Sequence, residues 1–123
     1  MTMADHEKLV IMATHGPEDR VRAVIPFVMG VAAVVSDVEC IIGFQGTSVE
    51  LLRDNVADEI EVTGFPPLRQ LMDDFVEQGG KLLVCAPCVE ARDLVPAPHF
   101  KVELVHAARF VAEICDATNA LTY

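Results

Sequence analysis

The stretch "GFPPLRQLMDDFVEQGGKLLVCAPCVEAR", residues 64–92, joins three local patterns within a short piece of chain. Its first half places apolar residues at spacings of three and four, which is typical of an amphipathic helix that the glycines at 79–80 end. The apolar run 81–85 follows and predicts a buried strand that stops at Cys85. A short helix is expected over about 87–94. A helix, a strand and a helix in direct succession favour an α/β layered fold.

The remainder of the chain repeats this alternation of strand and helix. The pattern predicts one domain over residues 1–123, a three-layer α/β/α arrangement with a mainly parallel sheet of about five strands. The acidic segment 54–64 carries little pattern and is expected to be a mobile surface loop. The other expected strands are residues 8–13, 38–44, 101–104 and 119–122, and the other expected helices are about 17–36, 48–53 and 107–114.

The composition limits both the partners and the location of the protein. Hydrophobic residues make up 52% of the 123 residues, and this excess predicts a sheet covered on both faces or a subunit interface. The net charge of −10, with nine scattered basic residues, argues against a nucleic-acid partner. No apolar run reaches the roughly 18 residues of a membrane helix, and the first residues lack a signal-peptide pattern. We therefore expect a cytoplasmic protein without a membrane partner.

Four cysteines are the main candidates for chemistry. The parallel strand pattern predicts that they are reduced thiols rather than a disulfide framework. The pair Cys85 and Cys88 could be a redox pair, half of a zinc site, a sulfur carrier, or two small apolar side chains. A structural zinc site needs four ligands, and the chain offers no second pair, so no metal is expected. Cys40 and Cys115 are expected to be buried and slow to react.

The carboxyl ends of parallel strands meet at one edge of a sheet, where ligand chemistry gathers. This edge should hold Cys85, Cys88 and, after the first strand, His15. A helix start beside Cys85 would lower the pKa of its thiol, and His15 would tune the thiol or donate a proton. The structural alternatives are apolar packing for the cysteines and a turn role for His15. His99 and His106 lack a partner pattern and are expected at the surface or in packing.

Four stretches of the sequence resemble the DsrE/DsrF-like family, a group of small α/β sulfur-relay and related proteins. The resemblance covers nearly the whole chain and implies a three-layer fold with assembly into homotrimers or hexamers. It also implies that a cysteine at the end of the third strand carries sulfur as a persulfide or thiosulfonate. In this sequence that position is Cys85, and the motif continues to match through Cys88 and Arg92. The four stretches are "MATHGPED" (12–19), "PFVMGVAA" (26–33), the stretch 64–92 quoted above, and "ALTY" (120–123).

These observations predict a cytoplasmic sulfur carrier. Cys85 would accept sulfane sulfur from a donor protein and pass it to an acceptor protein, a thiol exchange that needs no bound cofactor. Cys88 would resolve the persulfide and leave a Cys85–Cys88 disulfide. Two alternatives stay open: thiol-dependent peroxide reduction through a sulfenic acid on Cys85, and a non-catalytic oligomeric interaction or small-ligand-binding protein.

Overall fold

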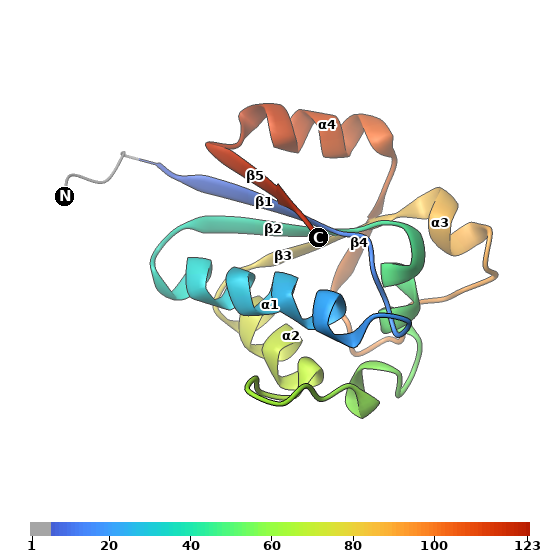
Figure 1. Ribbon diagram of the computed structural model, residues 1–123. Helices are drawn as coiled ribbons and strands as arrows, with labels where there is room; N and C mark the ends of the chain where they lie inside the picture. The colour runs from blue at the N-terminus through green and yellow to red at the C-terminus, as the bar shows by residue number, and fades with distance from the viewer. Residues whose placement is uncertain (1–5) are drawn as a thin grey trace.

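The computed structural model describes residues 6–123 and contains one sheet of five strands (Figure 1). Every pairing in this sheet is parallel, which confirms the predicted sheet. The strands lie in the order β4-β3-β2-β1-β5, so β2 is central and β4 and β5 form the edges. Their bounds are β1 Lys8–Ala13, β2 Glu39–Phe44, β3 Lys81–Cys85, β4 Val102–Val105 and β5 Asn119–Thr122.

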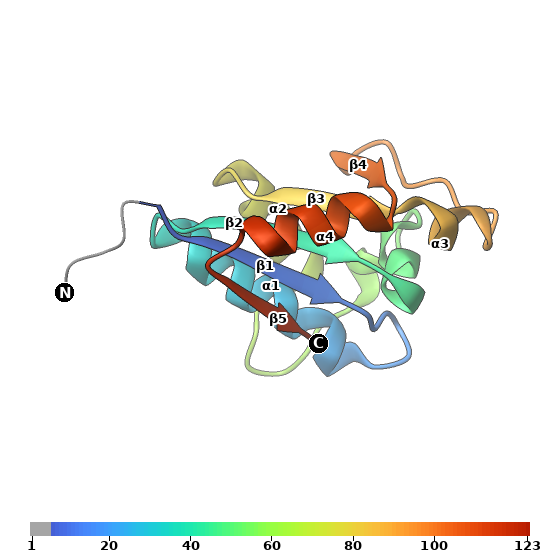
Figure 2. The same ribbon diagram turned by 90° about the horizontal axis from the view of Figure 1, so that it is seen from above.

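The helices cover the two faces of the sheet unequally (Figures 1 and 2). From β1 to β4 the chain steps across the sheet in one direction, and it returns from β4 to β5 in the other. Because such crossovers are right-handed, α4 must lie on the face opposite to α1 and α2. Among residues 6–123, the second face is therefore covered by a single helix. The helices are α1 Arg20–Val35, α2 Leu68–Glu77, α3 Ala86–Glu90 and α4 Ala107–Asp116, with 3₁₀ segments η1 Gly46–Leu52 and η2 Ala57–Glu59.

An apolar cluster lies on each side of the sheet. The larger cluster packs beneath α1 and α2 and includes Leu82 and Val84 of β3. The smaller cluster lies beneath α4 and includes Leu83. Since side chains alternate along a strand, Cys85 falls on the same side as Leu83, and it packs against the smaller cluster. The buried members of that cluster are Val10, Met12, Ile41, Leu83, Val105 and Phe110.

The first helix begins later than the sequence predicted. Asp19 is its N-cap, and the Asp19 carboxylate accepts a hydrogen bond from the backbone N–H of Arg22 at 3.1 Å. Glu18 instead joins two loops, because its carboxylate accepts hydrogen bonds from the Gly16 N–H at 2.8 Å and from the Thr47 hydroxyl. Burial alone would raise the pKa of Glu18, but these hydrogen bonds outweigh burial and hold the pKa below its ordinary value.

The acidic segment 54–64 contributes to the core, contrary to expectation. It contains η2, and the side chains of Ala57 and Ile60 are both buried. On its surface, the Asp58 carboxylate lies 3.1 Å from the guanidinium of Arg69. The mobility expected of this segment stays a prediction, which hydrogen exchange would measure.

The placement of Cys115 was also predicted wrongly. Cys40 is buried as expected, but Cys115 is exposed. Phe110 is the buried residue of α4, and five residues further on a helix has turned by about 140° from it. A single helix lying on a sheet can bury only one stripe of its surface, so Cys115 faces away from the sheet.

Candidate functional site

Cys85 lies where β3 ends and α3 begins. It is the last residue of the strand, which confirms the predicted strand end, and it is the N-cap residue of the helix. The helix begins at Ala86, one residue before the predicted start, and ends at Glu90, four residues before the predicted end. Its side chain is half-buried against the cluster beneath α4. The sulfur therefore lies at the carboxyl edge of the sheet, at the border between the core and the surface.

Cys88 belongs to the helix that begins directly after Cys85. Its thiol raises the pKa of the Cys85 thiol, and its backbone N–H lowers that pKa. Both cysteines are free thiols in the structure. Arg92 holds this segment in place, because its guanidinium donates to the Cys88 carbonyl at 3.1 Å and lies 3.4 Å from the Glu50 carboxylate.

The pKa of the Cys85 thiol is raised, whereas the sequence predicted that the helix start beside it would lower it. Burial is the largest cause and raises the pKa, and the interaction with the Cys88 thiol raises it further. The Cys88 N–H and the charge of Arg92 lower the pKa, as a helix start should, but they do not outweigh burial. Burial also raises the pKa of the Cys40 thiol, to about 12.

His15 reaches the same edge of the sheet as Cys85 but has a partner of its own. Its Nδ1 lies 3.2 Å from the Thr14 hydroxyl, which donates to the main-chain oxygen of Tyr123 at 2.6 Å. The hydroxyl is therefore free to accept a hydrogen bond from Nδ1–H. Because β2 lies between β1 and β3, His15 and Cys85 follow strands that are about 10 Å apart. This geometry favours the turn role for His15 over direct contact with the thiol.

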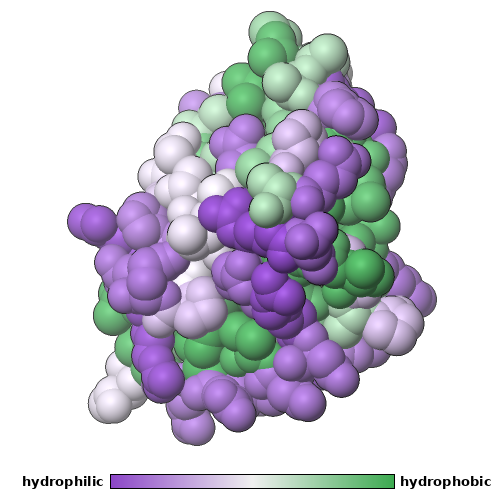
Figure 3. All heavy atoms as spheres, turned by 90° about the vertical axis from the view of Figure 1, so that its right-hand side faces the viewer, coloured by the Kyte–Doolittle hydropathy of each residue, from purple (hydrophilic) through white to green (hydrophobic). Residues whose placement is uncertain are grey.

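Figure 3 looks onto the edge where the strands end. Hydrophilic residues cover the middle of this face, and hydrophobic atoms gather at the top, where α4 lies. The exposed apolar side chains of α4 include Val111, which is 60% exposed, and Ile114. The candidate site is therefore bordered by polar surface and by an apolar helix face.

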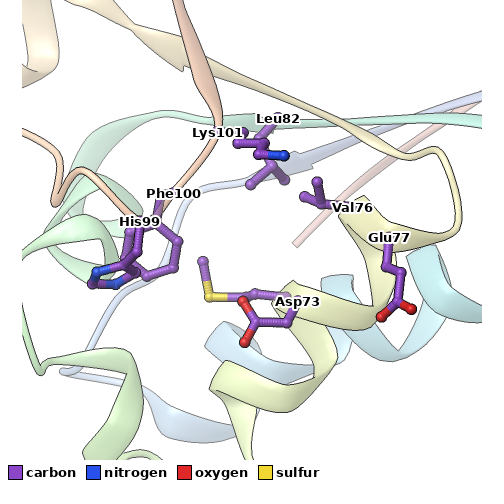
Figure 4. Close-up of a pocket in the computed structure, with 8 residues that line it drawn as sticks. Asp73, Val76, Glu77, Leu82, His99, Phe100 and Lys101 are labelled. Carbon is purple, nitrogen blue, oxygen red and sulfur yellow. The ribbon is translucent and has the colours of Figure 1, made fainter.

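A pocket of about 400 Å³ lies elsewhere, between α2 and the residues that lead into β4 (Figure 4). Asp73 and Glu77 of α2 face His99 and Lys101 across it. The pocket reaches the start of β3, at the opposite end of that strand from Cys85, so we do not count it as part of the candidate site. Its remaining lining residues are Met72, Val76, Leu82 and Phe100.

Within the described residues 6–123, no group of three or more His, Cys, Asp or Glu side chains is arranged to hold a metal ion. None of the helices in this part of the chain is long and apolar enough to cross a membrane.

Comparisons with known proteins identify the fold and the family. A model of the DsrE/DsrF-like family matches residues 7–123. The YchN protein of E. coli has a similar structure, with a TM-score of 0.78 and 16% identity over 95% of this chain and 99% of that one. No curated protein matches the sequence.

Two further solved structures are similar, and both are described as proteins of unknown function. BT1422 from Bacteroides thetaiotaomicron has a TM-score of 0.71 and 13% identity, over 95% of each chain. MTH1491 from Methanobacterium thermoautotrophicum has a TM-score of 0.68 and 14% identity, over 95% of this chain and 99% of that one. At such low identities, these likenesses show the fold alone.

Proposed function

Because the chain belongs to the DsrE/DsrF-like family, we propose that it is a sulfur carrier in which Cys85 holds sulfane sulfur as a persulfide. The observation that carries this proposal is the position of Cys85: a half-buried thiol at the carboxyl edge of a parallel sheet, beside a second free thiol. Partial burial would shield a bound sulfur atom from solvent, while the edge position leaves a path for a partner protein.

Loading is a thiol exchange. The Cys85 thiolate attacks the outer sulfur of a persulfide on a donor protein, and a new S–S bond forms at Cys85. The S–S bond of the donor breaks, and the donor leaves as a thiolate with the electron pair. The thiol proton of Cys85 passes to a nearby base. The reverse exchange, in which the thiolate of an acceptor protein attacks the outer sulfur on Cys85, unloads the carrier.

Cys88 provides a second route for unloading. Its thiolate attacks the inner sulfur of the Cys85 persulfide, expels the outer sulfur as hydrosulfide, and forms a Cys85–Cys88 disulfide. A dithiol reductant would then reduce this disulfide and restore both thiols, and the reductant would itself be oxidised to a disulfide. The interaction between the two thiols supports this role.

The location and assembly of the carrier are part of the proposal. We place it in the cytoplasm, where reduced thiols persist, in keeping with the four free cysteines. We also propose assembly of identical subunits, as trimers or hexamers, through the exposed apolar face of α4. A face that carries exposed Val111 and Ile114 is better covered by a partner than left in water.

The test is intact-mass analysis of the protein after incubation with inorganic polysulfide, followed by peptide mapping. We expect one added sulfur atom on Cys85, no loading in Cys85→Ser, and persistent loading in Cys88→Ala. Cys115→Ser is the matched control, because Cys115 is the exposed thiol outside the site. Equal loading of Cys85 and Cys115 would contradict the proposal. Turnover of hydrogen peroxide with dependence on Cys85 would instead support peroxide reduction.

A further inference from the structure

The end of β4 brings another histidine close to Cys85. Cys85 and Val105 are register partners in the parallel pair of β3 and β4. His106 follows Val105 directly and is the N-cap residue of α4. Neighbouring strands are about 4.8 Å apart, so the backbone of His106 lies about one strand spacing from that of Cys85. His15 follows a strand that is two spacings away.

The thiol of Cys85 also lies on the side of the sheet that α4 covers. It packs against the cluster that includes Val105 from β4 and Phe110 from α4. Figures 1 and 2 show the start of α4 beside the end of β4 and near α3. The sulfur therefore lies at a corner that the end of β4 and the beginning of α4 form together.

The imidazole of His106 is not committed to another structural role. The residue is exposed, and its side chain makes no capping hydrogen bond to α4. Its main-chain oxygen accepts a hydrogen bond from the Arg109 N–H at 3.0 Å. Within residues 6–123, no hydrogen bond or ion pair of the His106 side chain is formed. His15, by contrast, is paired with Thr14.

We infer that His106 is the base that accepts the proton of Cys85 when this thiol attacks an electrophilic sulfur. The inference rests on the proposed function of Cys85 and names a further residue of the same site. With inorganic polysulfide, the Cys85 sulfur bonds to a terminal sulfur, and the next S–S bond of the polysulfide breaks. The shorter polysulfide leaves with the electron pair, and the thiol proton moves to the unprotonated imidazole nitrogen of His106.

The need for a base follows from the environment of the thiol. Burial raises the pKa of Cys85, so little free thiolate is present at neutral pH. An imidazole is a side chain that can accept a proton at neutral pH. A base that follows the neighbouring strand β4 would supply the thiolate at the moment of attack.

The other charged groups around the thiol are already paired. Arg92 lies against the Glu50 carboxylate at 3.4 Å. On the α4 side, the Arg109 guanidinium lies 2.6 Å from Glu103 and 2.8 Å from Glu113. The thiol of Cys88 is a titratable neighbour that raises the pKa of Cys85. A change in reactivity near pH 6.5, the ordinary range of an imidazole, would therefore report on a histidine.

The test compares His106→Asn with the matched variant His15→Asn. Asparagine keeps the capping ability of an N-cap residue but has no imidazole. The rates at which Cys85 reacts with inorganic polysulfide and with iodoacetamide are measured across the pH range. Peptide mapping verifies that Cys85 is the residue modified. Thermal melting verifies that both variants fold.

For His106→Asn, we expect polysulfide loading at neutral pH to slow by about a hundredfold, the lower end of the range for general-base catalysis. The inflection that a histidine contributes to the pH profile should disappear, and added imidazole should restore part of the rate. His15→Asn should behave like the wild type.

Alkylation by iodoacetamide reports on deprotonation of the thiol whether or not the protein carries sulfur. If the wild type takes up no sulfur but His106→Asn still loses the inflection in alkylation, the sulfur-carrier function fails and the role of His106 stands. If the wild type loads sulfur and His106→Asn matches it in both rate and pH profile, the role of His106 is refuted and the carrier function stands.

Discussion

The ammonium of Lys8 lies 2.7 Å from the Glu113 carboxylate and 2.8 Å from that of Asp116. Lys8 begins β1 and is only 4% exposed, whereas its two partners belong to the end of α4. These two ion pairs and the buried ring of Phe110 attach α4 to the sheet. Because α4 is the single helix on that face, its attachment depends on few contacts.

Replacing Lys8 with methionine should therefore destabilise the protein. Lys8→Met keeps the apolar stem but leaves the largely buried Glu113 carboxylate without its ammonium partner. We expect the free energy of unfolding to fall by about 3 kcal/mol. This is the lower end of the range for breaking a buried ion pair, and we choose it because Asp116 is well exposed. Urea denaturation measures this. Lys101→Met, at an exposed position, should change stability little, and an equal loss in both variants would contradict the prediction.

The same ion pair predicts a loss of stability in acid. Hydrogen bonds from Lys8 and then Arg109 hold the pKa of Glu113 below its ordinary value. This contribution is complete above about pH 4.3, the unfolded pKa, and is lost as the pH falls through the folded value. The pKa of Lys8 is raised, chiefly by hydrogen bonds to Asp116 and Glu113, so its own contribution is lost only in strong alkali.

We expect the free energy of unfolding to decline below about pH 4, and to decline less steeply in Lys8→Met. Urea denaturation at a series of pH values measures the two slopes. Parallel curves for the wild type and Lys8→Met would show that Glu113 does not depend on Lys8.

Gly16 marks a close approach of two loops at the carboxyl edge of the sheet. A Cβ at this position would lie 2.2 Å from the carbonyl oxygen of Thr47, and backbone must move to relieve the clash. Gly16→Ala should lower the free energy of unfolding by about 1–3 kcal/mol, the cost of overpacking. Thermal or urea denaturation measures this, and unchanged stability would show that the two loops separate at little cost.

The sequence was sufficient to predict the five parallel strands and the end of β3 at Cys85. Apolar runs and the CxxC turn are local signals, and the structure agrees with them. It could not show which histidine follows a strand that pairs with β3, because His15 and His106 both follow strands of the sheet. Their distances from Cys85 depend on the strand order β4-β3-β2-β1-β5, which is set by pairing between distant segments.

The pKa of Cys85 and the exposure of Cys115 were missed for a related reason. The helix start beside Cys85 acts in the predicted direction, but the opposing burial comes from residues of β4, α4 and other distant segments. The apolar pattern of α4 suggested a buried helix, yet one helix alone covers that face of the sheet and buries only Phe110. A sequence pattern gives apolar positions without saying which of them face the same chain and which face a partner.

The exposed face of α4 should be the contact between subunits. Val111→Asp places a charge in this face and should shift an oligomer toward the monomer, as measured by sedimentation velocity. Val95→Asp is the matched control, because Val95 is 85% exposed and lies outside α4. Alkylation provides a second measurement. Cys115 also lies on α4, so it should react with iodoacetamide faster in Val111→Asp, where the contact is lost, than in the wild type. A wild type that sediments as a stable monomer at micromolar concentration would rule out this contact.

The thiol of Cys85 should titrate above the ordinary cysteine value of about 8.5, because burial and the Cys88 thiol both raise its pKa. Cys88→Ala removes the second of these causes but keeps the backbone N–H that favours the thiolate, so the midpoint should fall. Arg92→Gln removes a positive charge that lowers the pKa, so the midpoint should rise, while Arg92→Lys should stay closer to the wild type.

The pH dependence of Cys85 alkylation, followed in a Cys115→Ser background to remove the exposed thiol, gives these midpoints. Because the thiolate is the reacting species, the rate should increase with pH and level off above each midpoint. Cys40 should stay unreacted over the same range, since its thiol is buried and has a pKa of about 12. A midpoint that rises in Cys88→Ala would mean that the Cys88 thiol stabilises the Cys85 thiolate. In that case Cys88 would activate Cys85 for attack in addition to resolving its persulfide.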